Sequence, residues 1–172
     1  MAGARFEPLG EHDVEAVFHL WARAHGVPAE RMRQRLEIMT RHFGYPGFAG
    51  LGVWREGRLA GFVYGFTGKP GQWWYERVRA LMPPGMVRVW LGHSFEFTEL
   101  AVDPAQWGQG LGGRLHDAIL ERRPEPRALL TVSADNERAQ AFYLGRGWTR
   151  LLEDVRLVEA GPPLWVMGRR LG

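Results

Sequence analysis

The chain has 172 residues, of which 45% are hydrophobic and 24% charged, so it suits a folded globular domain and excludes a disordered one. Its 22 basic and 19 acidic residues give a net charge of +3, and no block of like charges forms a nucleic-acid tail. It has no cysteine, which excludes disulfides, thiolate metal sites and a cysteine nucleophile.

The first third of the chain alternates between strand and helix patterns. Residues 4–9 predict a strand. Apolar residues at helical spacing predict two adjacent helices, one over residues 14–25 and one that has Pro28 in its first turn and ends before Gly44. Two β-like runs follow at residues 48–54 and 59–66, joined by a turn that contains Gly57. They predict an antiparallel hairpin.

Residues 67–93 form an insertion that breaks this pattern. It is rich in aromatic residues, proline and glycine, and it contains Trp73 and Trp74. One short helix is predicted around Trp74 and Val78. A connection of this length is usually functional or mobile. Because 172 residues suit one domain and are short for two, we predict a single domain over residues 1–172 that includes this insertion.

The second half predicts strands at residues 95–102, 128–132, 148–152 and 164–167. Helices lie between the first three of them, one starting after Gly110 and one capped by Asn136. Helical crossovers between strands imply parallel pairs, whereas the hairpin is antiparallel. The fold class is therefore α/β (α+β), with a mixed sheet and helices on its faces.

In the strand predicted at residues 95–102, the apolar residues change from one face of the strand to the other. Phe95 and Phe97 share one face, but Leu100 and Val102 continue on the other, so the pattern slips near Glu99. Such a slip is typical of a β-bulge, which can open a strand to a ligand. The alternative is that both faces are buried.

Glycines 108, 110, 112 and 113 form a loop that opens a helix. Exposed N–H groups and the positive end of the helix dipole favour an anion there, and phosphate is the usual one. The spacing also satisfies a dinucleotide-binding pattern, with Asp135 as the ribose-binding acid. A kinase-type P-loop fails because no Gly-Lys-Ser/Thr ends the loop, and a ligand-free turn is the remaining alternative.

Two segments carry a family resemblance: V-D-P-A-Q-W-G-Q-G-L-G-G-R-L from Val102, and S-A-D-N-E-R-A-Q-A-F-Y-L-G-R-G-W from Ser133. They resemble the cofactor motifs of the GNAT superfamily of acyl-CoA-dependent N-acyltransferases. The resemblance implies a single-domain, mostly antiparallel sheet with helices on both faces and a splayed parallel strand pair. One departure is Trp107, which stands where the family usually has Arg or Gln.

The resemblance implies acetyl-CoA as co-substrate, held by two sets of residues. The strand and loop would contribute Leu100, Ala101, Val102, Trp107, Gly108, Gln109, Gly110, Leu111, Gly112, Gly113 and Arg114. The following helix would contribute Asn136, Ala139 and Phe142. NAD binding by an oxidoreductase and acyl-CoA binding without turnover are the alternatives.

Direct transfer to an amine requires a base, because a free alkylamine is mostly protonated at neutral pH. Glu99 is the first candidate, ahead of Glu96 and His93. Tyr143 matches the family tyrosine that protonates the leaving thiolate. A covalent acyl-enzyme is not expected, since neither serine near these motifs has a nucleophile-elbow context.

The acceptor is expected to be a primary amine on a small molecule, with a peptide N-terminus left open. Trp73, Trp74 and Glu96 are the candidate acceptor-binding residues, since aromatic rings hold apolar or cationic groups. The six histidines are not spaced as a metal site. We expect no metal, no nucleic-acid or membrane partner and a cytoplasmic location, and leave a homodimer open.

Overall fold

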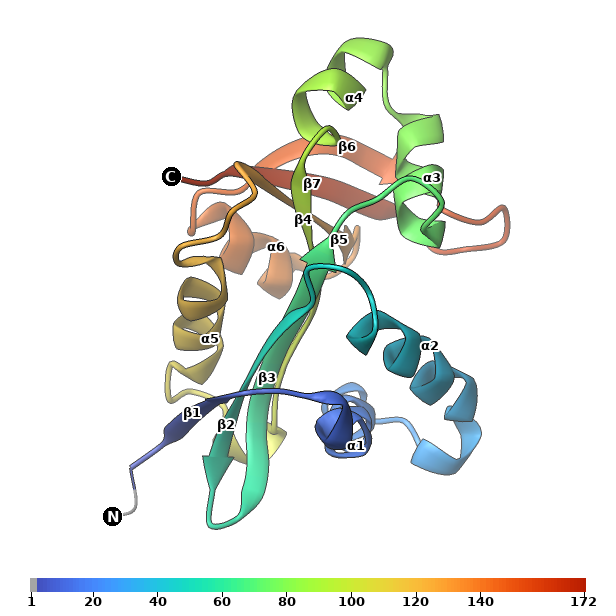
Figure 1. Ribbon diagram of the computed structural model, residues 1–172. Coiled ribbons are helices and arrows are strands. Elements are labelled where there is room, and N and C mark those ends of the chain that lie inside the picture. Colours follow the sequence, from blue (N-terminus) through green and yellow to red (C-terminus); the bar gives the residue numbers. More distant parts are fainter. Residues whose placement is uncertain (1–2) are drawn as a thin grey trace. The chain divides into compact units, whose positions relative to one another are not determined.

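The computed structural model describes residues 3–172 and is drawn in Figure 1. The chain divides into two compact units. Unit 1 comprises Met1–Phe66 and Thr98–Glu121, and unit 2 comprises Thr67–Phe97 and Arg122–Gly172. The predicted insertion, residues 67–93, falls wholly in unit 2.

Within residues 3–172, seven strands pair in the order β1-β2-β3-β4-β5-β7-β6. Strands β4 and β5 pair in parallel, whereas β1 with β2, β2 with β3, β5 with β7 and β6 with β7 are antiparallel. The sheet is therefore mixed and mostly antiparallel, which confirms the predicted fold class. The second late crossover does not create a second adjacent parallel pair, because β7 inserts between β5 and β6.

Unit 1 is built from three strands, the end of a fourth and three α-helices. The strands are β1 (Arg5–Pro8), β2 (Ala49–Arg55), β3 (Arg58–Thr67) and the last residues of β4 (Ser94–Val102). The helices are α1 (Val14–His25), α2 (Arg33–Phe43) and α5 (Leu111–Leu120), with short 3-10 turns η1 (Glu11–Asp13), η2 (Ala29–Arg31) and η3 (Pro104–Gln106). The order matches the sequence prediction.

Local chemistry accounts for where these elements end. Helix α1 ends at Gly26, whose φ of 65° is a left-handed conformation that favours glycine. The β2–β3 turn places Glu56 and Gly57 at φ values of 50° and 75°, as a tight hairpin turn requires. The predicted hairpin and both helices are confirmed, but α2 begins at Arg33 rather than at Pro28, whose backbone is extended before the 3-10 turn η2.

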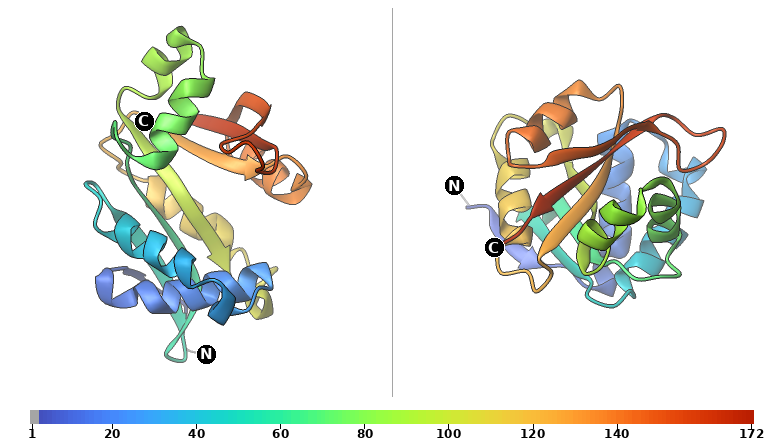
Figure 2. Two further views of the ribbon diagram at one scale, coloured as in Figure 1. Left: turned by 90° about the vertical axis from the view of Figure 1, so that its right-hand side faces the viewer. Right: turned by 90° about the horizontal axis from the view of Figure 1, so that it is seen from above.

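Helices cover both faces of the unit 1 strands. Phe62 and Tyr64 on β3 are fully buried in a cluster with α1 and α2, which lie side by side in Figure 2. Gly61 faces the other way, and a Cβ placed on it would meet Leu115 of α5 at 3.1 Å. Successive strand residues point to opposite faces, so α5 packs on the face opposite α1 and α2.

Unit 2 contains the start of β4, the remaining strands and three helices. The strands are β5 (Arg127–Ser133), β6 (Thr149–Val155) and β7 (Leu164–Arg170), and the helices are α3 (Trp73–Leu81), α4 (Pro84–Trp90) and α6 (Glu137–Leu144). Helix α3 buries Tyr75 and Val78 in a cluster with Leu129 and Val166 of the strands. The insertion therefore forms two helices rather than the one short helix that its sequence predicted.

Strand β4 passes from one unit to the other close to the predicted phase slip. Its parallel register with β5 runs over Ser94↔Arg127, Phe95↔Ala128 and Glu96↔Leu129. Both strands continue beyond this register, β4 to Val102 in unit 1 and β5 to Ser133 in unit 2. The bulge itself stays a prediction.

Candidate active site

The end of β4 leads into the glycine loop through a capped turn. Asp103 accepts a hydrogen bond from the backbone N–H of Ala105 at 3.0 Å and from Arg23 on α1 at 3.3 Å. Its own N–H donates to the carbonyl of Ala60 on β3 at 2.8 Å. Asp103 therefore fixes the direction in which the chain leaves the strand.

Two of the loop glycines are required by their backbone conformation. Gly108 and Gly110 have φ values of 80° and 75°, and a Cβ on either would meet no atom within 4 Å. Space is therefore available, but L-residues with side chains rarely adopt this φ. Gly112 lies within α5 and has no such requirement.

Helix α5 begins without a side-chain cap. Gly110 occupies the N-cap position and offers no side chain to accept from the first N–H groups, and no acidic residue stands in the first turn. The N–H groups at the start of a ten-residue helix are thus open to an external acceptor. This is the feature that the glycine spacing predicted.

Trp107 takes a position that its sequence alone did not reveal. Its side chain is 49% exposed, yet the indole Nε1–H donates to the backbone carbonyl of Val102 at 2.8 Å. The ring therefore ties the loop back to the end of β4. Trp107 contributes a tether within the protein, where the family residue is a polar chain.

Arginines hold the rest of the loop. Arg55, the last residue of β2, donates to the side-chain carbonyls of Gln106 and Gln109. Arg114, in the first turn of α5, places its guanidinium 4.5 Å from the ring centre of Phe6. Arg55 contacts the loop from β2 and Arg114 lies in the first turn of α5, so both positive charges make the surroundings of the uncapped helix start favourable for an anion.

Glu99 is a largely buried carboxylate with one cationic partner. Its side chain is 14% exposed and accepts from Arg35 of α2 at 2.5 Å. Burial raises the pKa of Glu99 above its usual range, while the positive charges of Arg35 and His25 lower it in part. A carboxyl with a raised pKa suits a general base that operates near neutral pH.

Four of the predicted residues of unit 2 lie on α6 or at its N-cap: Asn136, Ala139, Phe142 and Tyr143. Asn136 accepts from the N–H of Ala139 at 3.1 Å, which confirms its capping role. The ring of Tyr143 makes edge contacts with Phe97, Phe142 and Trp148, at centroid separations of 5.9, 5.1 and 5.7 Å. Tyr143 is thus a half-buried member of an aromatic cluster, and its catalytic role stays a prediction.

The two tryptophans of the insertion differ in their surroundings. Trp74 is half-buried against the unit 2 core and its Nε1–H donates to Thr131 of β5 at 3.4 Å. Trp73 is 55% exposed, with the guanidinium of Arg77 5.3 Å from its ring centre. Trp74 therefore anchors α3, while more than half of the Trp73 surface is exposed. Glu96, at 5% exposure, is more deeply buried than Glu99.

Sequence reasoning missed Arg35 and Arg55. Both arginines lie far along the chain from the side chains that they bind, Glu99 and the loop glutamines. One signal was present: Arg35 interrupts the polar and apolar pattern of α2 between Met32 and Leu36, which both pack on the core. An arginine beside that apolar stripe needs a partner, and Glu99 supplies it.

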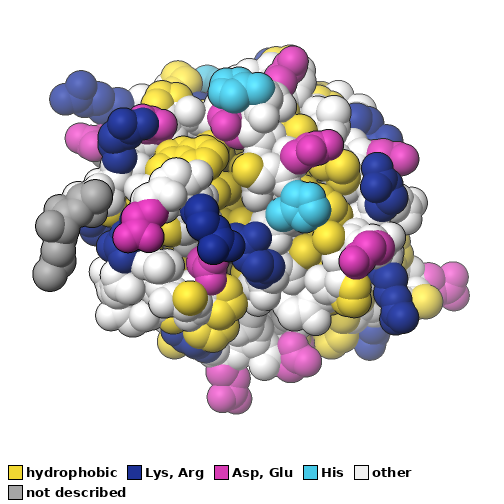
Figure 3. Space-filling model, turned by 90° about the horizontal axis from the view of Figure 1, so that it is seen from below, with side chains coloured by type: hydrophobic (Ala, Val, Ile, Leu, Met, Phe, Trp, Pro, Cys, Tyr) yellow, Lys and Arg dark blue, Asp and Glu magenta, His cyan; other side chains and the backbone are white. Residues whose placement is uncertain are grey.

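Residues 3–172 contain neither a metal-ion cluster nor a membrane-spanning helix. Within that range no three histidine, aspartate or glutamate side chains gather as a metal-ion site. None of its helices combines the length and apolar character needed to cross a bilayer. On the face drawn in Figure 3, basic and acidic side chains are interspersed.

The fold is that of an α/β protein, and its glycine loop leads into a helix whose first N–H groups have no side-chain cap and suit an anionic ligand. The Acetyltransferase (GNAT) family model matches residues 14–148. The chain therefore belongs to the GNAT family of acetyltransferases, which confirms the resemblance seen in its sequence. Acetyltransferases of this family use acetyl-CoA.

Individual relatives agree with this assignment. A GCN5-like protein acetyltransferase of Mycobacterium tuberculosis is 30% identical over 121 residues, which are 66% of this chain and 59% of the relative. The chain thus spans less than two thirds of that protein's length.

Solved structures of low identity share the fold. A putative GNAT acetyltransferase of Desulfovibrio desulfuricans has a TM-score of 0.72 at 14% identity, covering 99% of this chain and all of the other (100%). The ribosomal-protein-S18-alanine N-acetyltransferase of Escherichia coli has a TM-score of 0.71 at 19% identity, covering 99% and 95%. The PaiA N-acetyltransferase of Thermoplasma acidophilum, in complex with coenzyme A, has a TM-score of 0.61 at 14% identity, covering 98% and 99%.

Proposed function

We propose that this protein is an N-acetyltransferase that moves an acetyl group from acetyl-CoA directly to a primary amine of a small molecule. The observation that carries the proposal is the uncapped start of α5 in the same unit as the buried carboxylate of Glu99. The first feature binds an anionic cofactor, and the second accepts a proton. An acetyltransferase that works through a ternary complex needs both.

The loop fits the pyrophosphate of coenzyme A. The left-handed glycines Gly108 and Gly110 leave open space where a side chain would stand. The N–H groups of Leu111 to Gly113 have no side-chain cap, and Arg114 adds a positive charge beside them. Acetyl-CoA would supply the activated acetyl group, and the backbone near Leu100 to Val102 would pair with its pantetheine arm.

Glu99 would remove the proton from the acceptor ammonium. A carboxylate at an ordinary pKa of about 4.3 is too weak a base for an alkylammonium with a pKa of about 10, so a raised value narrows the gap. Burial supplies that rise in this site. Tyr143, in unit 2, is proposed as the acid that protonates the leaving thiolate, on the family motif that it matches.

One observation favours a second candidate, a module that binds acyl-CoA without turnover. Arg35 already holds Glu99 in an ion pair, and an ion-paired carboxylate is a poorer base. The two candidates agree on cofactor binding and differ in turnover. A test must therefore separate binding from thiol release.

Cofactor binding is tested by thermal unfolding with acetyl-CoA and with NAD. A ligand that binds the folded state raises the melting temperature, so acetyl-CoA is expected to raise it and NAD is not. Turnover is tested by the release of free thiol over a broad panel of primary amines, including short peptides. Absence of any shift at millimolar acetyl-CoA contradicts both candidates, whereas a shift without thiol release supports the binding module.

A further inference from the structure

The ion pair between Arg35 and Glu99 is held in one geometry but is not closed off. The guanidinium lies 4.8 Å from the ring centre of Trp21, whose own ring is 6% exposed and so forms a fixed support. The Arg35 side chain remains 31% exposed, against 14% for Glu99. A ligand can therefore reach the arginine more easily than the carboxylate behind it.

Arg35 has donors to spare. Its Nε–H is buried and has no hydrogen-bond partner. The indole Nε1–H of Trp21 beside it is also buried and has none. An arginine carries five N–H groups in a planar fork that matches a carboxylate. Because these two N–H groups are buried, an acceptor atom can reach them only if the Arg35 side chain turns, and it then removes the cost of leaving them unpaired.

We propose that Arg35 binds a carboxylate of the acceptor, so that the substrate is an amine that carries its own nearby carboxylate, such as a free α-amino acid. This deepens the proposed function and rests on it. The acceptor's two charges exchange partners with the ion pair: its ammonium turns to Glu99 and its carboxylate to Arg35. Each of the four charges then faces a charge of opposite sign, so none is left uncompensated in the site.

The exchange also explains why an ion-paired Glu99 can act as a base. The groups that face Glu99 are Arg35 on α2 and His25 on α1, and both stabilise its charged form. When a substrate carboxylate engages Arg35, that stabilisation weakens and the proton affinity of Glu99 rises. One proton then passes from the ammonium nitrogen to Glu99, which leaves a neutral amine, and no other reactant is needed.

An amine without a carboxylate would bring a second cation to the same place. It would face Arg35 without an anion of its own, and like charges repel in a poorly hydrated site. In amino acid amides and at peptide N-termini, no free carboxylate stands next to the amine as it does in a free α-amino acid. The inference therefore separates free amino acids from both simple amines and peptides.

The test uses sets of acceptors that share a side chain: an amino acid, its amide and the decarboxylated amine. Thiol release is measured with acetyl-CoA for the wild type, Arg35→Gln and Arg35→Lys. The control is Arg33→Gln, which removes an exposed positive charge from the same helix. Thermal unfolding with each acceptor, in the presence of coenzyme A, gives a readout that does not require turnover.

The wild type is expected to favour the amino acid, with kcat/KM about 10- to 100-fold above its amide and amine, as the loss of one charged hydrogen bond predicts. Arg35→Gln should lose this preference, and the acid limb of its pH profile should move to higher pH. Arg33→Gln should keep both. Arg35→Lys, which keeps the charge and the fold but not the fork, should lose part of the preference.

Equal use of all three acceptors, or an unchanged preference in Arg35→Gln, would overturn the inference and leave acetyl transfer intact. If no acceptor releases thiol, the proposed function fails. Thermal unfolding with each acceptor then tests whether Arg35 binds a carboxylate. Amino acids that stabilise the wild type but not Arg35→Gln support a carboxylate site. Amino acids that stabilise neither overturn it.

Discussion

The indole N–H of Trp107 and the carbonyl of Val102 lie 2.8 Å apart and join the glycine loop to the end of β4. The indole satisfies a backbone group in the stretch where the pantetheine arm of the cofactor is expected to pair. Its ring is about half exposed. The hydrogen bond therefore adds a constraint on where the loop begins to those from the Asp103 turn and Arg55.

Replacing Trp107 with Phe removes this bond and keeps an aromatic ring. We expect acetyl-CoA to bind about fivefold more weakly, because a hydrogen bond worth about 1 kcal/mol no longer orders the loop. Titration calorimetry measures the change. Trp73→Phe, at an exposed position of unit 2, serves as the control and should leave the Kd unchanged. Tighter binding in Trp107→Phe would mean that the indole competes with the cofactor for Val102.

Glu99→Gln tests the base directly. We expect kcat to fall by about 10²- to 10⁴-fold, the usual contribution of a general base, while acetyl-CoA affinity is unchanged. The wild-type kcat/KM should rise with pH through the pKa of Glu99, because the ionised form is the base. Since burial raises that pKa, the acid limb should lie above the usual glutamate value of about 4.3. A loss of rate in Glu96→Gln instead would move the assignment to Glu96.

The sequence predicted the parts of the site that are local in the chain. A pattern within a few residues is enough to predict the glycine loop, the strand before it and the helix capped by Asn136. The partners of Glu99 and of the loop do not, because Arg35 and Arg55 reach them only after the chain has folded. Helix α4 was missed because its Pro83-Pro84-Gly85 start has the composition of a turn, although proline also suits the first turn of a helix.

His42 gives unit 1 a pH-dependent stability. Burial first, and then the charges of Arg35 and Arg41, lower its pKa from 6.5 to about 4. Between these values the unfolded chain binds a proton that the folded protein does not. The free energy of unfolding should therefore fall as the pH drops from about 6.5 to about 4, by about 3 kcal/mol in total.

Urea unfolding at pH 7 and at pH 4.5 measures this loss for the wild type and two variants. His42→Gln should lose most of the difference, because glutamine does not titrate. His19→Gln, at an exposed position of α1, should behave as the wild type. Equal pH dependence in all three proteins would show that His42 is not the responsible group.

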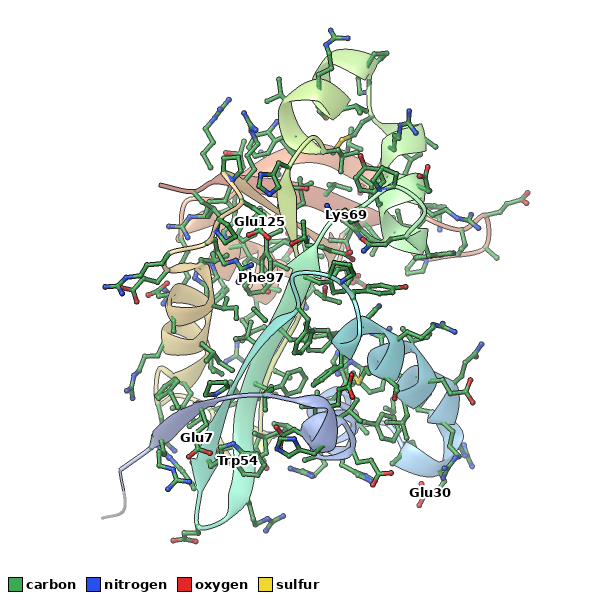
Figure 4. All side chains as sticks on the ribbon, viewed as in Figure 1. Glu7, Glu30, Trp54, Lys69, Phe97 and Glu125 are labelled. Atoms are coloured by element: carbon green, nitrogen blue, oxygen red, sulfur yellow. The ribbon has the colours of Figure 1, made fainter. Side chains whose placement is uncertain are left out.

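Glu125, labelled in Figure 4, anchors a buried network in unit 2. Its carboxylate, with a fully buried side chain, accepts from Arg123 at 3.0 and 3.2 Å and from Thr67 at 2.7 Å. Burial alone would raise its pKa, but the hydrogen bonds from Arg123 and Thr67 outweigh it and hold the pKa below the usual value. The contribution to stability is present above about pH 4.3 and is lost as the pH falls through the lowered pKa.

Glu125→Ala should lower the free energy of unfolding by about 3–5 kcal/mol, because it leaves Arg123 buried without its partner. The matched control is Glu153→Ala, which breaks the surface pair with Arg150, where both side chains are about half exposed. That variant should cost less than about 1 kcal/mol. Similar midpoints in urea for the two variants would mean that the Glu125 network relaxes without loss.

Gly110 and Gly112 lie two positions apart and should respond oppositely to alanine. At Gly110 the φ of 75° disfavours any side chain, so Gly110→Ala should cost about 1–2 kcal/mol of stability and weaken acetyl-CoA binding. At Gly112 a Cβ would meet only Val102, at an ordinary 3.8 Å, within a helix. Gly112→Ala should therefore stabilise the protein by about 0.5–1 kcal/mol and keep the Kd. Urea unfolding and calorimetry measure both variants, and a loss of binding in Gly112→Ala would show that the cofactor approaches the Cα of Gly112 closely.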